Sequence, residues 1–281
     1  MKKIIVIFII LIACNVSAKD TIYWLEPTYE PFWIETGDMK DKGFEQVKRK
    51  WLEQKLPEYN HQRIVCNFPR LQKYLLKKKG KKNGVYAWTT VSIEPQYLKG
   101  ALHTVESAKI PDYEIATLNK NLSRFKNGQS VSLHKDILPD MSLRMGIEAG
   151  TCANTGITDD ECKQKNVYEV SKTNQEAFYK MMIKGRIDYY LTTAFNFKYC
   201  MDKLGIADKF VLIPYQEASA FLKAYGYAGD TPKGKELIEK LNKIFRTQEY
   251  YEIQRESHRP FLTKDKFKLI DAANRKLILG D

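Results

Sequence analysis

Aromatic and hydroxyl side chains close two strand-like segments of this sequence. Trp88, Thr89 and Thr90 end the segment GVYAWTT, and Thr192 and Thr193 end the segment RIDYYLTT. Aromatic faces suit sugars, cyclic molecules or cations, and hydroxyls orient a small molecule through hydrogen bonds. If the two segments face each other, their tips supply the apolar and polar groups of a small-molecule pocket.

The elements before these tips follow one pattern twice. YLLKKKGKKNGVYAWTT and YKMMIKGRIDYYLTT each run from a helical stripe through glycine into an apolar strand that ends on polar residues. This is the αβ half of a βαβ unit, and alternating strands and helices predict parallel sheets with helices on their faces. Ligands bind outside the carboxyl ends of such strands. Two units in tandem therefore predict a cleft between two sheet edges.

Periodicity and turn residues give the remaining elements. We expect strands at 20–27, 61–68, 84–90, 113–118, 142–150, 166–171, 186–195 and 209–215, and helices at 44–56, 69–80, 174–185 and 196–206. The polar, glycine-bearing stretch 119–130 is interpreted as a boundary between the two units.

Residues 1–18 form an expected signal peptide. Lys2 and Lys3 precede an apolar run, and Val16-Ser17-Ala18 offers a small-residue cleavage site, so the mature chain is expected to begin near Lys19 in the periplasm. The run before Cys14 also resembles a lipoprotein cleavage box. Membrane attachment through Cys14 therefore stays open.

Charge and cysteine content limit the partners. The net charge of +12 comes from lysines spread over the whole chain, which indicates a solvated basic surface or attraction to anionic solutes or cell-wall polymer. No nucleic-acid recognition motif accompanies it, so nucleic acid is not an expected partner. Among the exported cysteines, Cys152 and Cys162 are the local candidate for a disulfide. The four histidines are scattered, so we expect neither a metal site nor a cofactor.

Motifs at three places carry a family resemblance. MIKGRIDYYL contains Gly185, Arg186 and Asp188 in a G-r-v-D pattern, and SLRMGIEAGT ends on Gly150 and Thr151. With the tail EASAFLKAYGYAGDTPKGKELIEKLNKIFRTQEYYEIQRE, these motifs make residues 20–256 resemble type II periplasmic solute-binding proteins of the polar amino acid class (family 3). Through the L-P-x-Y-x-H pattern at 56–61, the chain resembles an uncharacterised proteobacterial branch of that family.

The resemblance implies an α/β fold of two lobes, each a mostly parallel sheet flanked by helices, joined by two hinge strands. Lobe 1 would comprise residues 19–116 and 220–281, and lobe 2 residues 117–219. The resemblance also implies a monomer that captures a small solute for an inner-membrane ABC permease or a sensor, without catalysis.

Two departures from the family pattern affect the expected solute. Amino acid binders of this class carry an arginine shortly after the third strand, whereas TTVSIEPQYLKG has Glu94 and Pro95 near that place. The acid that meets the ligand's amino group is replaced around Thr193 and Ala194. The charge of the solute therefore stays open. The expected ligand-binding residues are Glu26, Tyr29, Phe32, Trp33, Trp88, Thr89, Thr90, Gly150, Thr151 and Thr193.

Two other functions remain as alternatives. An enzyme on the same fold acting on a small cyclic substrate would need paired carboxylates, for which Glu26 and Glu94 are the candidates. The chain contains no G-x-S-x-G, H-E-x-x-H or P-loop motif to support catalysis. A stand-alone interaction protein would instead hold a partner between its lobes and would have a shallow cleft.

Overall fold

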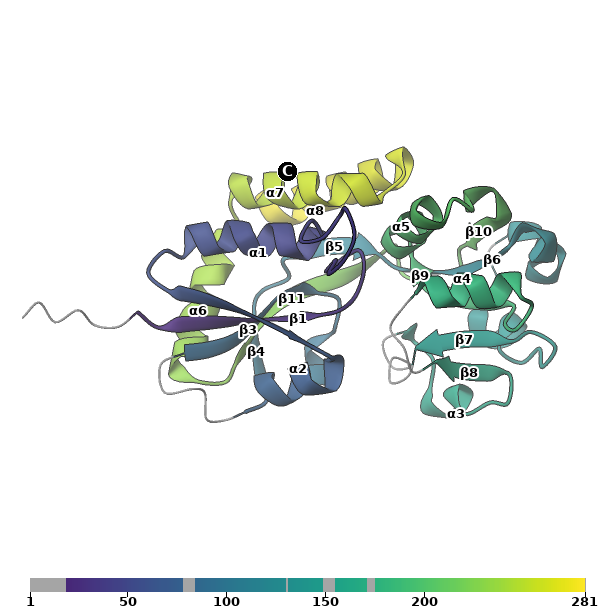
Figure 1. The fold of residues 1–281 in the computed structure, drawn as a ribbon, viewed down its shortest axis with the longest axis horizontal. Coiled ribbons are helices and arrows are strands. Elements are labelled where there is room, and N and C mark those ends of the chain that lie inside the picture. Colours follow the sequence, from purple (N-terminus) through teal and green to yellow (C-terminus); the bar gives the residue numbers. More distant parts are fainter. Residues whose placement is uncertain (1–18, 78–83, 130, 149–154, 171–174, 281) are drawn as a thin grey trace, which may run out of the picture.

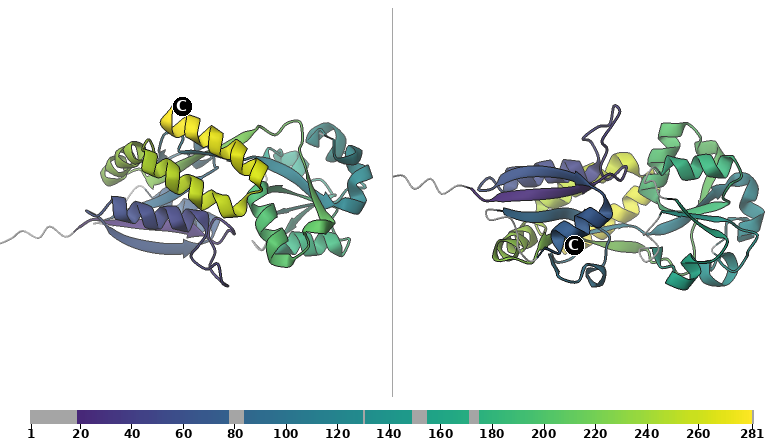
Figure 2. Two further views of the ribbon diagram at one scale, coloured as in Figure 1. Left: turned by 90° about the horizontal axis from the view of Figure 1, so that it is seen from above. Right: turned by 60° about the horizontal axis from the view of Figure 1, so that its bottom comes forward.

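The described part of the chain forms two lobes, each built around its own β-sheet (Figure 1). The computed structural model describes residues 19–77, 84–129, 131–148, 155–170 and 175–280. Helices cover both sheets, and the two lobes lie side by side in both views of Figure 2. The expected two-lobed α/β architecture is confirmed.

The first lobe holds a six-stranded sheet in the order β2-β1-β3-β11-β4, with β5 also paired to β11. Its strands are β1 (Thr21–Pro27), β2 (Asn60–Cys66), β3 (Gly84–Val91), β4 (Ala101–His103), β5 (Ala108–Pro111) and β11 (Phe221–Gly229). β1 pairs in parallel with β2 and β3, whereas β11 is antiparallel to β3, β4 and β5. Five strands therefore share one direction, and only β11 opposes them.

The second lobe repeats this arrangement. Its sheet has the order β10-β6-β9-β7-β8 and consists of β6 (Tyr113–Leu118), β7 (Met145–Glu148), β8 (Val167–Val170), β9 (Tyr189–Thr193) and β10 (Phe210–Ile213). β7 is parallel to β8 and β9, and β6 is antiparallel to β9 and β10. β3 and β9, the two strands with polar tips, thus occupy equivalent places, each between a parallel neighbour and the one reversed strand.

Helices on the sheet faces build the cores. The first lobe carries α1 (Phe44–Lys55), α2 (Phe68–Leu75), α6 (Pro232–Ile244), α7 (Gln248–His258) and α8 (Lys264–Leu279), and the second carries α3 (Asp159–Cys162), α4 (Glu176–Ile183) and α5 (Ala194–Leu204). β1 is buried along its whole length, as expected for a strand covered on both faces. Alternate residues serve the two faces: Ile22 and Trp24 pack with α1 and α6, and Tyr23 and Leu25 pack with α2.

Short helical turns fill several connections. They lie at Pro95–Leu98, Asn119–Gly128, Leu133–Ile137, Ala207–Lys209 and Arg259–Phe261. The stretch that the sequence marks as a boundary is therefore partly helical, and it lies within the second lobe next to β6 and β10. Gly185 ends the α4 segment with a φ of +63°, a left-handed conformation that favours glycine. The glycine stop expected before β9 is thus confirmed.

The chain changes sheets at two adjacent connections. β5 pairs within the first sheet and β6 within the second, so the first crossing lies at Asp112. The return lies between β10 and β11, where Ser219 donates its backbone N–H and its hydroxyl to Asp112 Oδ2 over 2.7 and 2.9 Å. The expected boundary at 116/117 falls inside β6, because the aromatic and β-branched pattern marks a strand but not the sheet it joins.

Two observations concern membrane and cysteine chemistry. No helix within the described ranges has the length and apolar character needed to cross a bilayer. Cys66 and Cys200 are buried free thiols, whereas Cys162 is disulfide-bonded. Cys152, its expected partner, and Cys14, the candidate lipid site, lie outside the described residues. The pairing of Cys152 with Cys162 therefore stays a prediction.

Replacing Gly234 with alanine is expected to destabilise the first lobe by about 1–3 kcal/mol, because core overpacking forces backbone to move. A Cβ on Gly234 would lie 2.0 Å from the Gly229 carbonyl oxygen, where α6 meets the end of β11. Gly229→Ala is the matched control, since its Cβ would meet only the Leu75 carbonyl at 3.5 Å. Urea unfolding of both variants measures the difference, and equal losses would contradict this account of the α6–β11 contact.

Candidate functional site

Three of the expected binding rings lie in the core of the first lobe. Phe32, Trp33 and Trp88 are 6%, 1% and 1% exposed. The Trp33 and Trp88 rings lie 6.2 Å apart, and Trp88 also packs edge-on against Phe68. These residues therefore pack beneath the loop that follows β1 and do not present free faces to a solute. Sequence could not separate the two roles, because an aromatic loop suits a pocket wall and a core equally.

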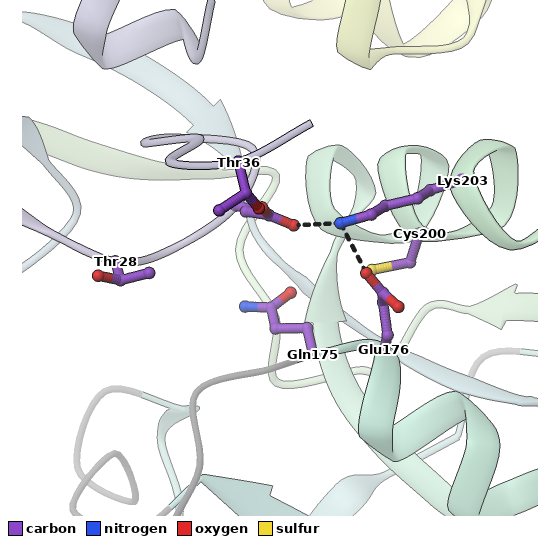
Figure 3. A pocket seen from close by; sticks show the side chains of 7 residues that line it. Thr28, Thr36, Gln175, Glu176, Cys200 and Lys203 are labelled. Atoms are coloured by element: carbon purple, nitrogen blue, oxygen red, sulfur yellow. Dashed lines mark hydrogen bonds and ion pairs between the residues drawn. The ribbon is translucent and has the colours of Figure 1, made fainter. Parts of the chain in front are cut away.

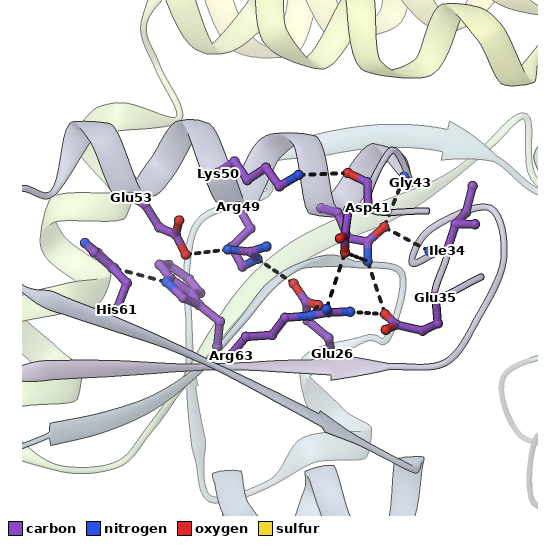
Figure 4. Close-up of polar contacts among 12 residues, drawn as sticks. Glu26, Ile34, Glu35, Asp41, Gly43, Arg49, Lys50, Glu53, His61 and Arg63 are labelled. Atoms are coloured by element: carbon purple, nitrogen blue, oxygen red, sulfur yellow. Dashed lines mark hydrogen bonds and ion pairs between the residues drawn. The ribbon is translucent and has the colours of Figure 1, made fainter. Parts of the chain in front are cut away.

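Glu26 is a member of a buried ion cluster rather than a free ligand group (Figure 4). Its carboxylate accepts from Arg49 Nε at 2.5 Å and from Arg63 Nε. Arg63 also pairs with Glu35 and Asp41, which belong to the loop between β1 and α1. Glu26 thus anchors that loop to β1 and β2. This contradicts its expected role in binding and removes the Glu26–Glu94 pair as a catalytic candidate.

The hydroxyl groups at the two strand tips have different surroundings. Thr193 is 3% exposed and caps α5, since it accepts from the Asn196 N–H and donates to Asn196 Oδ1. The Thr89 hydroxyl is buried, with no hydrogen-bond partner among the described residues. The Thr90 side chain and all of Gly150 and Thr151 lie outside the part of the structure that is described. Their expected roles therefore remain predictions.

The structure assembles a cluster that the sequence did not indicate as a unit. Tyr29, after β1, interacts electrostatically with Tyr113 at the start of β6 and with Glu148 at the end of β7. Tyr190, on β9, interacts with the same three side chains. We call these four residues the tyrosine–glutamate cluster. Tyr29 comes from the first lobe and the other three from the second, so the cluster joins the two lobes.

Strand register places Tyr190 and Glu148 on one face of the second sheet, whereas Tyr113, three positions from the Ala116 that pairs with Tyr190, starts β6 on the other face. Tyr190 is paired with Gly146 across β9 and β7, so its ring lies on the same sheet face as Glu148, two residues beyond Gly146. Ile187 and Phe178 pack directly against Gly146, because a Cβ there would lie 2.6 and 2.8 Å from their side chains. Glu148 is the last residue of β7. The sequence pattern pointed to Gly150 and Thr151, and the acidic residue at the end of the strand before them carries no motif of its own.

Burial controls the protonation of this cluster. Glu148 is 6% exposed, and burial raises its pKa to about 7. Burial likewise raises the pKa of Tyr29, and the nearby Tyr113 and Glu148 raise it further, whereas contact with Gln175 of the second lobe lowers it. The pKa values of Tyr113 and Tyr190 are also raised, chiefly by burial. At neutral pH the three phenols are therefore uncharged, and Glu148 is close to half ionised.

A cavity of about 180 Å³ lies between the lobes (Figure 3). It is lined by residues of both lobes: Thr28, Glu30, Thr36, Gln175, Glu176, Cys200 and Lys203. Lys203 Nζ, on α5, contacts Glu30 of the first lobe at 2.9 Å and Glu176 of α4 at 2.7 Å. Burial alone would lower the pKa of Lys203, but hydrogen bonds to Glu176 and Glu30 outweigh it and raise that pKa. Lys203 is thus a charged bridge between lobes.

An aromatic contact accompanies this bridge. Phe195, in the first turn of α5, is fully buried and lies 4.8 Å from Phe44 of the first lobe, centroid to centroid. It also packs edge-on against His258 at 4.8 Å. Asn196 donates to the Glu30 carbonyl at 3.1 Å. The start of α5 is therefore embedded in the first lobe, so the two lobes are in direct contact on this side of the molecule.

Comparisons with known proteins bear on the fold. No protein-family model and no curated protein matches the chain. Solved structures do match it. A periplasmic binding protein with high arginine specificity from Salmonella typhimurium has a TM-score of 0.57 and 15% identity, with 87% of this chain and 100% of that chain covered.

Two further structures widen the comparison. A histidine kinase sensor domain with similarity to periplasmic binding proteins has a TM-score of 0.62 and 10% identity, over 87% of this chain and 96% of that one. The substrate-binding protein of an amino acid ABC transporter has a TM-score of 0.57 and 12% identity, over 86% and 98%. Identities this low establish the fold alone. The chain therefore has the fold of periplasmic binding proteins.

Glu26→Gln is expected to reduce the free energy of unfolding by about 1–3 kcal/mol, because it removes the buried charge that accepts from two guanidinium groups and leaves Arg49 only with Glu53 and Arg63 only with Glu35 and Asp41. Glu249→Gln is the matched control: Glu249 pairs with Lys55 at the surface and is 63% exposed, so its loss should stay below about 1 kcal/mol. Urea denaturation at neutral pH measures both. Similar losses in the two variants would show that the ion cluster does not hold the loop.

Glu148→Gln is expected to stabilise the ligand-free protein at pH 8 but not at pH 4. Because the folded-state pKa is raised from 4.5 to about 7, the protonated carboxyl stabilises the fold fully below pH 4.5, and this contribution is lost as the pH rises through 7. The advantage of the variant should therefore grow by about 3 kcal/mol between these pH values. Urea midpoints across the range test this, with exposed Glu169→Gln on β8 as the control. If the difference in stability between variant and wild type stayed constant with pH, the side chain of Glu148 would be exposed to water and this account would be wrong.

Proposed function

We propose that this protein captures a small solute between its two lobes and passes it to an importer or a sensor. The observation that carries this proposal is the tyrosine–glutamate cluster, in which Tyr29 of one lobe meets Tyr113, Glu148 and Tyr190 of the other. Tyr29 follows the carboxyl end of β1 and Glu148 ends β7, and such strand ends are the sheet edges at which α/β proteins bind ligands. The shared fold of periplasmic binding proteins supports the same function.

A solute would close the two lobes because it contacts both of them only in the closed arrangement. A solute that touches both lobes binds the closed arrangement more tightly than an open one, and it shifts the population by that difference in affinity. Lys203–Glu30 and Asn196–Glu30 are the polar contacts between α5 and the loop after β1. These contacts favour the closed arrangement only modestly, because Lys203 remains 39% exposed. Phe195, buried against Phe44, adds an apolar contact to the same arrangement, and the solute adds its own contacts with both lobes.

We expect the solute to be periplasmic, because residues 1–18 are interpreted as a signal peptide. Transfer to an inner-membrane ABC permease and regulation of a sensor kinase are both compatible with the fold, since the structural neighbours include the substrate-binding protein of an ABC transporter and a histidine kinase sensor domain. The enzyme alternative has lost its carboxylate pair, because Arg49 and Arg63 neutralise Glu26. Non-catalytic binding is therefore the function that we propose.

A thermal-shift screen of the mature protein tests this function. Amino acids, polyamines, sugars, nucleosides and organic anions are the classes to include, because a solute that binds only the folded state raises its melting temperature. Tyr29→Ala should lose most of the shift given by any hit. Tyr97→Ala, which removes a half-exposed tyrosine elsewhere in the same lobe, should keep it.

Small-angle X-ray scattering separates capture from surface binding. A hit should reduce the radius of gyration. If the ligand-free protein is already compact, the radius should stay unchanged and the hit should slow hydrogen exchange of the Phe195 and Tyr190 backbone amides. Absence of a shift with all five classes, together with unchanged scattering, would reject solute capture. It would favour the stand-alone interaction protein.

A further inference from the structure

We propose that Phe195 is a latch that holds the two lobes together when no solute is bound, so that the ligand-free protein rests closed. This inference goes beyond the proposed function, because it concerns the state of the protein before a solute arrives. The observation that supports it is a phenylalanine of the second lobe whose ring is fully buried within the apolar core of the first.

Three rings of the first lobe surround Phe195. They belong to Phe32 in the loop after β1, Phe44 at the start of α1 and His258 at the end of α7. Their centroids lie 6.1, 4.8 and 4.8 Å from that of Phe195, and Phe32 and His258 meet it edge-on. Separations of about 4.5–7 Å with tilted or edge-on rings are the favourable geometry for aromatic pairs. The start of α5 therefore completes the core of the first lobe.

The helix that carries Phe195 is nevertheless part of the second lobe. Thr193, the last residue of β9, caps α5 by accepting from the Asn196 N–H, and Cys200 and Met201 are buried in the core of the second lobe. Bending at the chain crossings would therefore withdraw Phe195 from the three rings. Exposing a fully buried phenylalanine side chain opposes such an opening by about tenfold or more in the equilibrium. Phe195 and a solute thus favour the same arrangement.

The remaining contact between α5 and the first lobe is loosely packed. A cavity of about 490 Å³ lies between α5, the loop after β1 and the turn Arg259–Phe261, with Met39, Tyr199 and Phe261 among its walls. The Lys203–Glu30 ion pair on the same helix is partly exposed, so salt screens it. Removal of the Phe195 ring alone should therefore be enough to release the lobes.

Small-angle X-ray scattering of the ligand-free protein tests the latch, after unfolding and refolding to remove any bound solute. We expect the wild type to give the radius of gyration calculated from the structure, at low and at high salt. Phe195→Ala should give a larger radius, and Phe195→Leu, which keeps an apolar side chain, a smaller increase. Phe197→Ala is the matched control: this ring lies on the same helix but packs within the second lobe, 6.1 Å from Tyr179, so the radius should stay that of the wild type.

Far-UV circular dichroism and urea unfolding establish that each variant is folded, and Phe195→Leu decides the question if Phe195→Ala does not fold. An extended wild type, an unchanged radius in the folded Phe195 variant, or an equal increase in Phe197→Ala would overturn the inference. Solute capture is judged separately. A solute class that raises the melting temperature leaves capture intact whatever the latch shows. An opened Phe195→Ala without any hit would support the latch and reject capture.

Discussion

The arrangement of the whole molecule depends on the two places where the chain passes between its sheets. β6 and β11 are the only reversed strands of their sheets, and each begins directly after a crossing. Asp112 in one crossing holds Ser219 in the other, and Lys266 of α8 pairs with Glu114 of β6 at 2.9 Å. Because the crossings are short and tied together, the lobes can differ in orientation only by bending there. Tyr113 follows Asp112, so one ring of the cluster moves with the hinge itself.

Two buried carboxylates show how the surroundings decide what the same chemical group does. Glu26 is surrounded by guanidinium groups, and its charge links β1, β2 and α1. Glu148 lies at the end of β7, where burial raises its pKa to about 7. An ion-paired carboxylate such as Glu26 stabilises the fold at neutral pH, whereas a carboxylate whose pKa is raised by burial, such as Glu148, destabilises it. Strained or destabilised groups concentrate at functional sites, where a ligand offsets their cost.

The sequence predicted the elements well and the site poorly, for a physical reason. Periodicity identified β1, α1, α4 and β9 because burial imposes a regular pattern on neighbouring residues. The tyrosine–glutamate cluster has no such local signal, since its other members lie 84 positions or more from Tyr29 in the chain and come near it only through the folding of the second sheet and the contact between lobes. Trp88 stands at a strand tip, as the pocket prediction required, yet its ring is enclosed by Phe68 and Tyr227. Which face a strand-end side chain takes is decided by tertiary packing.

A fixed loop in the first lobe and a second lobe that moves about the hinge would make the tyrosine–glutamate cluster selective. The loop after β1 is fixed by Arg63, and Gln46 Oε1 accepts from the Ile34 and Gly43 N–H groups at 2.9 and 3.1 Å (Figure 4). Tyr29 is therefore presented in one position before a solute arrives, which reduces the ordering cost of binding. The second lobe brings Glu148 and Tyr190 on a rigid sheet. On the proposed function, a solute that contacts both lobes would therefore have to match a distance set by the hinge.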